Sequence, residues 1–473
     1  MADAFEAVIV GMGPAGMAAA IELCRRGAHV AVVDENPQPG GQVYRRFAQE
    51  FTAEDETSLG VNYAKGKKLI EEFWKVGKQC VVLNDTHVWG GFADNQLALR
   101  HADKIALIKY KKLLLAEGAS ERPSVFPGWT LPGVMTLGGL QKLVSREFLL
   151  PGKRFLIAGA SPLLIPVAAE VLKAGGEVAG ICTVVPLGRY LNLFPKLVFQ
   201  REILFEAIRH AFEIVRRNAP VFSGYTVVSC AGEKRIRKAG IAKLDANGRI
   251  AGGSMRTFEI DILAASNGII TMSRLGRQLG CRHEYDSEGL CWQVKTAPFF
   301  RSSQADIYAA GDSHVIGGRD LAEWNGRMAG LEIAKDLGRI PADEFNRLLS
   351  DNAGRRERLR RYVSTLQRVL SPGANQIGRQ DLNTIVCRCE QVTLGDVLSG
   401  IEKGCRTMHE IKRTRVGMGL CQGRVCESIV TEIILGKGIP IEEIGYFGIR
   451  QPIAPIPIAL LERYAAQDAR ESA

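Results

Sequence analysis

The N-terminal stretch constrains the fold more than any other part of the chain. A short apolar strand, a glycine-rich turn and an alanine-rich helix follow one another there, and the turn reads G-x-G-x-x-G at Gly11, Gly13 and Gly16. Such glycines allow a tight turn, a close approach of the backbone to a pyrophosphate, and close packing of the helix on the strand. The free N–H groups of the helix then face the phosphates. The stretch therefore predicts a dinucleotide-binding fold.

The residues around the turn complete the predicted nucleotide site. A second apolar strand, 30–33, ends at Asp34, whose carboxylate is placed to accept hydrogen bonds from ribose hydroxyls. Glu35 is the weaker alternative for this role. The other predicted cofactor-binding residues are those that begin the helix and those of the following PGGQ segment, namely Pro14, Ala15, Gly41 and Gln42. A glycine-rich turn without a ligand is the competing interpretation, but it requires strand, helix and acid to fall in place by chance.

A later stretch indicates which dinucleotide is bound. A short strand over 307–310 runs into Gly311 and Asp312, and a helical pattern follows. This stretch resembles the second FAD motif of flavoproteins with two dinucleotide-binding domains, in which the matching Asp binds the ribityl chain. The resemblance implies FAD, with Asp312 as a ligand; a simple strand-ending turn is the alternative. The segment LLLAEGASERP resembles a crossover of the same flavoproteins and adds Gly118 to the predicted site.

A second, weaker copy of the nucleotide motif begins at Lys153. Repetition of a strand-turn-helix-strand unit suggests an inserted second nucleotide fold. Its fingerprint is damaged, because Ser161 and Leu164 stand where motif glycines belong and the next strand ends without an acid. We expect this fold to be kept without binding NAD(P). No cysteine pair accompanies either unit, so a thiol-relay mechanism is not expected.

Four cysteines near the C-terminus predict a metal centre. They form C-x-C at Cys387 and Cys389, and C-x4-C at Cys421 and Cys426, and a helical pattern follows each pair. Thiolates beside helix N-termini and free N–H groups suit an anionic iron–sulfur centre. Zinc is the second option, although C-x-C is an uncommon zinc spacing. Disulfides are the third and least favoured, since the chain has no secretory signal. We expect Cys405 to be a bystander.

Length and charge limit the remaining choices. A chain of 473 residues is too long to fold around a single hydrophobic core, so we expect two or three domains. A net charge of +10 permits a nucleic-acid surface, but no DNA- or RNA-binding motif accompanies it, so we expect none. With neither a signal peptide nor a long apolar run, we expect a cytoplasmic protein, with room for peripheral attachment to the inner membrane. No catalytic constellation is recognisable, and His314, beside the flavin motif, is expected to have a structural role.

The order of these motifs along the chain resembles that of one particular group of proteins. The FAD fingerprint, the damaged second fold, the Gly-Asp motif, the cysteine domain and the tail RQPIAPIPIALL together resemble the A subunits of opine oxidases. The chain is also similar to the B subunit of hydrogen cyanide synthase and to the alpha subunits of D-hydroxyproline and L-proline dehydrogenases. The resemblance implies a 2Fe-2S cluster on Cys387, Cys389, Cys421 and Cys426, in a domain of the bacterioferritin-associated-ferredoxin type.

The resemblance also implies partners. A glycine-oxidase-like, FAD-containing beta subunit would oxidise the C–N bond of a secondary amine. The remaining implied components are a small 2Fe-2S gamma subunit, FMN at a subunit interface and an external acceptor such as a quinone. We therefore expect this chain to be the electron-transfer subunit of an FAD-dependent amine or opine dehydrogenase. A subunit of hydrogen cyanide synthase or of hydroxyproline or proline dehydrogenase, a stand-alone NAD(P)H-dependent flavin reductase, and a zinc-bearing scaffold remain as alternatives.

The predicted fold class is α/β: a Rossmann-like flavoprotein with two dinucleotide-binding domains, plus a small helical 2Fe-2S domain. The expected domains are an FAD-binding domain in two parts (1–118 and 269–340), a degenerate NAD-like domain (119–268), a helical linker (341–383), the 2Fe-2S domain (384–436) and a proline-containing tail that docks on the body or a partner (437–473).

Overall fold

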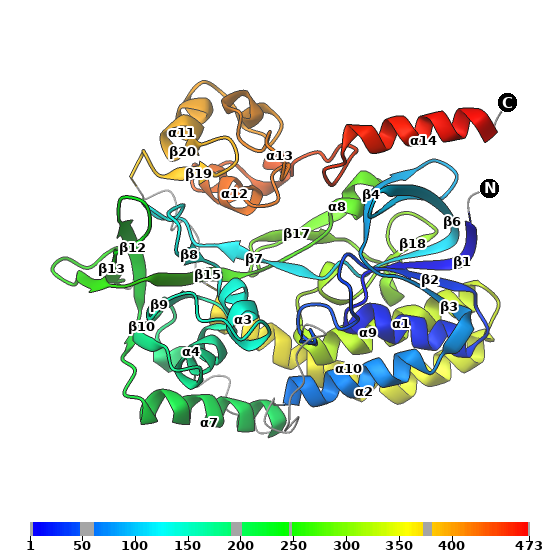
Figure 1. Cartoon of the computed structure of the whole chain (residues 1–473), viewed down its shortest axis with the longest axis horizontal. Coiled ribbons are helices and arrows are strands. Elements are labelled where there is room, and N and C mark those ends of the chain that lie inside the picture. The colour runs from blue at the N-terminus through cyan, green and yellow to red at the C-terminus, as the bar shows by residue number, and fades with distance from the viewer. Residues whose placement is uncertain (1–2, 48–60, 191–200, 246–247, 372–380, 472–473) are drawn as a thin grey trace.

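The computed structural model describes residues 3–47, 61–190, 201–245, 248–371 and 381–471, and Figure 1 shows their arrangement. Two α/β bodies, each built on its own sheet, lie side by side, and a small C-terminal domain lies across one side of them. Within these described ranges, no helix is both long enough and apolar enough to cross a membrane.

The first body is built on a seven-stranded sheet of order β3-β2-β1-β6-β5-β4, with β18 pairing the end of β6. The strands β1, β2, β3, β6 and β18 are parallel neighbours, while β4 and β5 are antiparallel. Helices α1, α2 and α9 pack on one another beside this sheet (Figure 1). The bounds are β1 Asp3–Val10, α1 Pro14–Arg25, β2 Val30–Val33, α2 Val61–Trp74, β3 Cys80–Leu83, β4 Thr86–Phe92, β5 Gln96–His101, β6 Lys104–Leu115, β18 Ile307–Ala309 and α9 Gly318–Asp336.

The second body is built on a sheet of order β11-β10-β9-β15-β7, in which β8 also pairs with β15. A separate antiparallel sheet, β12-β13-β14, lies beside it. The bounds are β7 Ala119–Pro123, β8 Val134–Met135, α3 Leu137–Ser145, β9 Arg154–Gly159, α4 Leu164–Lys173, β10 Glu177–Thr183, α5 Leu187–Tyr190, α7 Arg201–Arg216, β11 Val221–Ser223, β12 Tyr225–Ala231, β13 Lys238–Lys243, β14 Arg256–Glu259 and β15 Ile262–Thr271.

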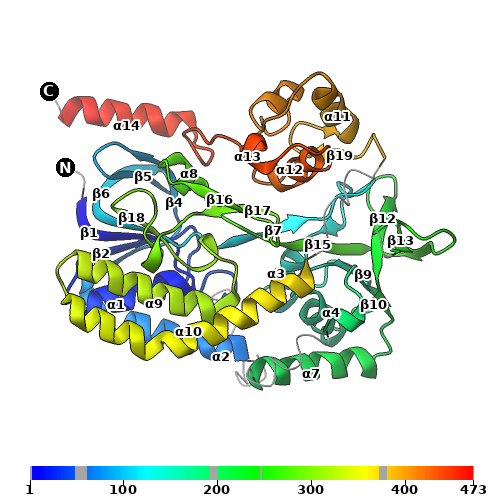
Figure 2. The same cartoon turned by 180° about the vertical axis from the view of Figure 1, so that it is seen from behind.

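The remaining elements join the bodies and form the C-terminal domain. Figure 2 shows the long helix α10 running along the first body toward the second. The bounds are η2 Gly77–Gln79, α8 Arg274–Gln278, β16 His283–Asp286, β17 Cys291–Val294, η4 Pro298–Phe300, η5 Gly311–Ser313, α10 Ala342–Leu370, β19 Ile385–Cys387, β20 Val392–Thr393, α11 Leu394–Glu402, η7 Glu410–Thr414, α12 Glu427–Leu435, α13 Ile441–Ile444 and α14 Ile458–Glu471.

Local sequence signals fix several of these ends. The predicted second strand, 30–33, forms as β2 and is fully buried. At the start of α11, the Thr393 side chain accepts from the Asp396 amide, and the Asp396 side chain accepts from the Thr393 amide. This reciprocal pair is a capping box, and it satisfies two N–H groups that a helix start leaves free.

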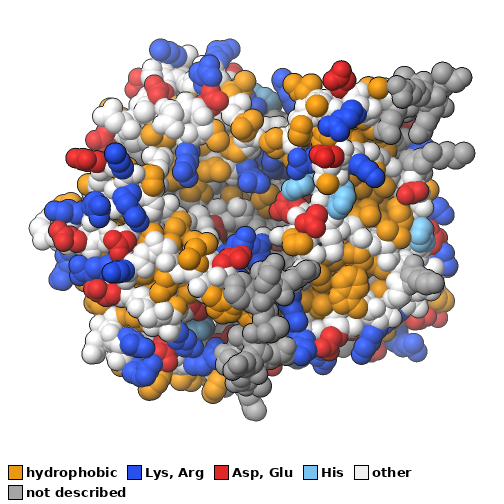
Figure 3. Space-filling model, in the orientation of Figure 1, with side chains coloured by type: hydrophobic (Ala, Val, Ile, Leu, Met, Phe, Trp, Pro, Cys, Tyr) orange, Lys and Arg blue, Asp and Glu red, His pale blue; other side chains and the backbone are white. Residues whose placement is uncertain are grey.

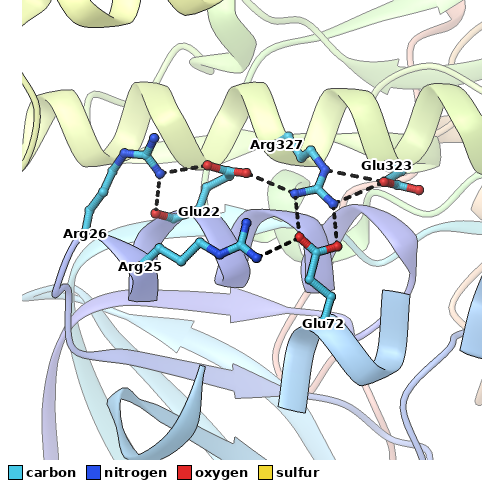
Figure 4. A network of polar contacts seen from close by, with 6 residues as sticks. All are labelled: Glu22, Arg25, Arg26, Glu72, Glu323 and Arg327. Atoms are coloured by element: carbon cyan, nitrogen blue, oxygen red, sulfur yellow. Dashed lines mark hydrogen bonds and ion pairs between the residues drawn. The ribbon is translucent and has the colours of Figure 1, made fainter. Parts of the chain in front are cut away.

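A network of charges ties α1, α2 and α9 together (Figure 4). The guanidinium of Arg327 on α9 donates to Glu22 at 3.0 Å and to Glu72 at 2.9 Å, on α1 and α2 respectively. It also donates to Glu323 on its own helix. Arg25 and Arg26 of α1 form ion pairs with Glu72 and Glu22, respectively. Burial has the largest single influence on Glu72 and raises its pKa, but the hydrogen bonds and charges of Arg327 and Arg25 together outweigh it and lower the pKa. Arg327 therefore links α9 to both α1 and α2.

We expect Arg327→Met to lower the free energy of unfolding by about 1–2 kcal/mol at pH 7, less than for a fully buried pair because water screens this one. A carboxylate with a lowered pKa stabilises the fold above its unfolded-state pKa, and that stability is lost as pH falls through the folded-state pKa. The deficit of the variant should therefore shrink as pH falls below 4.5, the ordinary value for Glu72. Denaturant titrations at several pH values measure it. Arg25→Met, at a residue that is 51% exposed, is the control and should cost less.

Candidate functional site

The carboxyl ends of three parallel strands meet at one edge of the first sheet. Gly11 follows β1, Gly118 lies just beyond β6, and Gly311 follows β18. The ladders hold these ends level, since Val10 pairs with Leu115 and Leu115 pairs with Ala309. In addition, the Gly118 amide donates to the Ser313 hydroxyl at 2.9 Å. Ligands of open α/β sheets bind at such an edge.

The two later glycines of the motif have different reasons to be glycine. A Cβ on Gly16 would lie 1.8 Å from the carbonyl oxygen of Gly11, so the fold itself excludes any side chain there. A Cβ on Gly13 would meet only the Cα of Gly41, at 3.9 Å. The backbone of Gly13, with φ of −79° and ψ of −174°, suits any residue. Neither packing nor backbone strain in the protein explains a glycine at position 13, whereas a ligand pressed against the backbone does.

Asp34 lies at the end of β2 and is buried. Its Oδ2 accepts from the Met12 amide at 2.5 Å, and its Oδ1 accepts from the Asn36 amide at 2.8 Å. The carboxylate therefore fixes the glycine-rich turn in place, whatever else it binds. Glu35 points differently: its side chain is 65% exposed and lies 3.6 Å from His87 Nδ1.

The other predicted residues mostly come to the same edge. Pro14 and Ala15 form the buried first turn of α1, and Gly41 packs on Gly13. Asp312 is partly buried; its Oδ1 accepts from the Gly317 amide at 3.0 Å, and burial raises its pKa. Gln42 is exposed and accepts from Arg45 at 2.8 Å. Its part in cofactor binding remains a prediction, as do the roles of the others.

Sequence reasoning missed Glu117, which lies between β6 and Gly118. Its side chain is partly buried, with the Oε2 atom enclosed, and burial raises its pKa to about 7. The Oε2 atom has no hydrogen-bond partner among the described residues. The signal was a carboxylate inside the apolar run LLLAEGA, at the end of a strand that leads to the predicted flavin edge.

The second nucleotide fold forms, but its turn is filled. Helix α4 starts at Leu164, which is 2% exposed, and the Ser161 hydroxyl accepts from the Leu163 amide at 3.3 Å. The helix start carries no side-chain cap. A buried leucine thus occupies the position at which a nucleotide-binding helix has a glycine; the absence of NAD(P) binding there remains a prediction.

The four C-terminal cysteines are brought together from two segments. Cys387 ends β19, and Cys426 is the N-cap of α12; each is 1% exposed. Their thiols interact, and the thiols of Cys389 and Cys421 interact in the same way. Among the described residues, no three Cys, His, Asp or Glu side chains form a closed metal-binding array; the four thiols stand as two adjacent pairs. Cys405 lies apart, 3.5 Å from the carbonyl oxygen of Glu410.

The surroundings of Cys387 favour its thiolate form. The Cys426 thiol, together with the amides of Gly417, Glu390 and Cys389, lowers the pKa of Cys387 to about 6. In turn, Cys387 and burial raise the pKa of Cys426 well above its usual value. Four such thiols cannot all ionise side by side unless a cation joins them, as a bound metal would.

The cysteine domain is fastened to the body through buried polar contacts. Arg122 of β7 forms an ion pair with Glu432 of α12, with side chains 3% and 5% exposed. The Arg277 guanidinium donates to Glu427 at 2.6 Å, and the Trp129 indole donates to the carbonyl oxygen of Ile385 at 2.6 Å. These partners come from distant parts of the chain, so sequence spacing gave no signal for them.

Over the face shown in Figure 3, the described Lys and Arg side chains are scattered among acidic and apolar ones and do not gather in one stripe. Of the remaining cysteines, Cys80 is partly buried and the others are buried, namely Cys24, Cys182, Cys230, Cys281 and Cys291.

Two nucleotide folds with converging glycine turns define a class, the two-domain flavin oxidoreductases. The family model "Pyridine nucleotide-disulphide oxidoreductase" matches residues 5–329, and this membership implies FAD as the cofactor of the first fold. The model "Sarcosine oxidase A3 domain" matches residues 383–465, which include all four cysteines. More narrowly, the chain belongs to the family formed by the A subunits of opine oxidases and the HcnB subunits of hydrogen cyanide synthases.

Curated relatives cover nearly the whole chain. The chain is 34% identical to the HcnB subunit of hydrogen cyanide synthase from Pseudomonas aeruginosa, over 97% of this chain and 99% of that protein. It is 30% identical to the A subunit of opine oxidase from Agrobacterium tumefaciens, over 98% of this chain and 92% of that protein. Among solved structures, L-proline dehydrogenase from P. horikoshii has the same fold, with a TM-score of 0.69 and 19% identity over 97% of this chain and 79% of that one.

Proposed function

We propose that this chain is the electron-transfer subunit of a multi-subunit, FAD-dependent amine or opine dehydrogenase. The observation that carries the proposal is the meeting of two distant cysteine pairs, Cys387 with Cys426 and Cys389 with Cys421, on a domain fastened to a flavoprotein body. The relatives are named as subunits of opine oxidase and of hydrogen cyanide synthase, and these names support a role within a complex.

In this proposal the four cysteines hold a 2Fe-2S cluster. Soft thiolates suit iron–sulfur clusters and zinc alike, and the choice rests on the surroundings. Backbone N–H groups aimed at Cys387 suit the sulfur atoms of a cluster, whose hydrogen bonds tune its potential. Lys412 lies near Cys426, and burial lowers the pKa of its ammonium group. The negative charge of an iron–sulfur cluster would offset the positive charge of this ammonium group.

FAD would lie against Gly11, Gly13 and Gly16, with Asp312 and Gly118 toward the flavin end. Flavin exchanges two electrons and an iron–sulfur cluster one, so together they would pass a pair on singly. The protein's part is to hold the backbone donors and the partly buried carboxyl groups of Asp312 and Glu117 at fixed positions beside the cofactor. In the proposed complex, a glycine-oxidase-like subunit oxidises the amine and an external acceptor receives the electrons.

The test begins with the purified chain, isolated without oxygen. We expect about one FAD, two iron atoms and two acid-labile sulfides per chain, and no rapid bleaching of the flavin by NADH. Co-purification with the product of a neighbouring glycine-oxidase-like gene should then give amine-dependent reduction of both centres.

Each alternative predicts a different result. A chain with neither flavin nor iron would contradict the proposal. One zinc and no iron would indicate a scaffold that supports its partner, and rapid bleaching by NADH would indicate a stand-alone flavin reductase. Reduction by one opine, by glycine or by a proline derivative would identify the substrate.

A further inference from the structure

A cavity of about 40 Å³ lies between the cysteine domain and the body. Its walls come from the end of β15, from α8, from the hairpin β16–β17 and from the first turn of α12 with the loop before it. A buried water needs roughly 10–15 Å³, so the cavity has room for two or three waters or for one ion the size of phosphate.

Polar side chains that line this cavity lack partners. They come from all its walls, and their atoms are buried without a hydrogen bond within the described part of the chain. These atoms are Ser273 Oγ, Arg274 Nε and Nη2, Arg277 Nε, Tyr285 OH, Trp292 Nε1 and Ser428 Oγ. Buried polar groups are nearly always hydrogen-bonded, so such a concentration around one cavity calls for a ligand.

The chemistry of these atoms selects the kind of ligand. The unpartnered atoms of Arg274, Arg277 and Trp292 belong to guanidinium and indole N–H groups, which can only donate hydrogen bonds. The hydroxyls of Ser273, Tyr285 and Ser428 can also donate. A ligand that satisfies this set must offer several acceptor atoms in different directions, as the oxygens of an oxyanion do.

The charge of the lining agrees with this choice. Arg274, Arg277 and Arg424 line the cavity, with Glu427 as the only carboxylate among the lining residues. That carboxylate is already engaged, because its Oε1 accepts from Arg277 and, at 2.8 Å, from the Phe447 amide. Burial and the nearby Arg424 lower the pKa of Arg274, while Glu117 and Cys421 oppose this only in part. The cavity therefore holds positive charge that lacks a full counter-charge.

We propose that this cavity binds a small oxyanion, such as phosphate, between Arg274 and Trp292. The bound ion would join α8 and the β16–β17 hairpin of the body to the start of α12, directly after Cys426. It would thereby add to the Arg277–Glu427 contact that fastens the cysteine domain in place. Neither the four cysteines of the proposed cluster nor the glycines of the first nucleotide turn line this cavity, so phosphate binding is measured separately from the proposed electron transfer.

The experiment titrates the purified full chain with inorganic phosphate and with sulfate, at constant ionic strength maintained with chloride. Calorimetry follows binding, and the fluorescence of Trp292 reports it when spectra of Trp292→Phe are subtracted. We expect saturable binding and a higher melting temperature. Arg274→Gln should weaken phosphate binding by about tenfold or more, because it removes charge-assisted hydrogen bonds. The matched control is Arg282→Gln, at an exposed residue of the same segment, which should bind as the unchanged chain does.

Two outcomes would overturn the site. The first is the absence of saturable binding by the unchanged chain, in which case waters fill the cavity. The second is unchanged binding in Arg274→Gln. If that variant does not fold, Trp292→Phe, which keeps an aromatic side chain but loses the indole N–H donor, should bind phosphate several-fold more weakly by calorimetry, and unchanged binding there would count against the site. Glycerol 3-phosphate distinguishes a free ion from a phosphate ester: tighter binding than phosphate identifies the ester as the ligand.

Discussion

Replacing Cys426 by serine is expected to remove most of the iron from the chain, leaving below about a tenth of the original content, because a hydroxyl is a poor ligand where soft thiolates are required. The side chain is almost fully buried, and its thiol interacts with that of Cys387. Serine has nearly the same shape, so the helix start at α12 should persist. Iron analysis and the visible absorption spectrum measure the result.

Cys405→Ser is the matched control for that change. Cys405 is buried in the same domain, but its thiol lies beside the carbonyl oxygen of Glu410 and away from the four others. We expect this variant to keep its iron. Retention of iron by Cys426→Ser, or equal loss in both variants, would contradict the proposed cluster.

The second large effect concerns two glycines three residues apart. Gly13→Ala is expected to lower the affinity for FAD by about tenfold or more while the protein without flavin melts as before. The structure leaves room for this methyl group, since only the Cα of Gly41 lies within 4 Å of it. A pyrophosphate bound close to this backbone would collide with the added methyl group.

Gly16→Ala makes the same change with a different expected result. Its methyl group would lie 1.8 Å from the Gly11 carbonyl oxygen, so α1 must move away from β1. Overpacking of this kind costs about 1–3 kcal/mol or more, and the fold itself should suffer. Flavin titration and thermal melting of the flavin-free protein separate the two effects. Equal melting temperatures for the two variants, or full FAD affinity in Gly13→Ala, would contradict this assignment.

Local patterns in the sequence were sufficient for several elements. The buried strand β2 formed where its residues predicted it, because a strand in the middle of a sheet needs a continuous apolar run. The capping box at Thr393 is equally local, since it depends only on residues three apart. The exact start of the helix after the flavin motif, at Gly318, could not be read in this way, since no side chain caps it.

The sequence by itself determined the nucleotide folds, the family and the four cysteines as a set. Each of these depends on residue types at fixed spacing along one segment. Only the tertiary structure decided that Cys387 lies beside Cys426 and Cys389 beside Cys421, that Arg327 joins three helices, and that unpartnered donors from the body and the cysteine domain surround one cavity. Those arrangements join residues hundreds of positions apart or on separate segments. Their contact is set by the packing of whole domains, which no local spacing encodes.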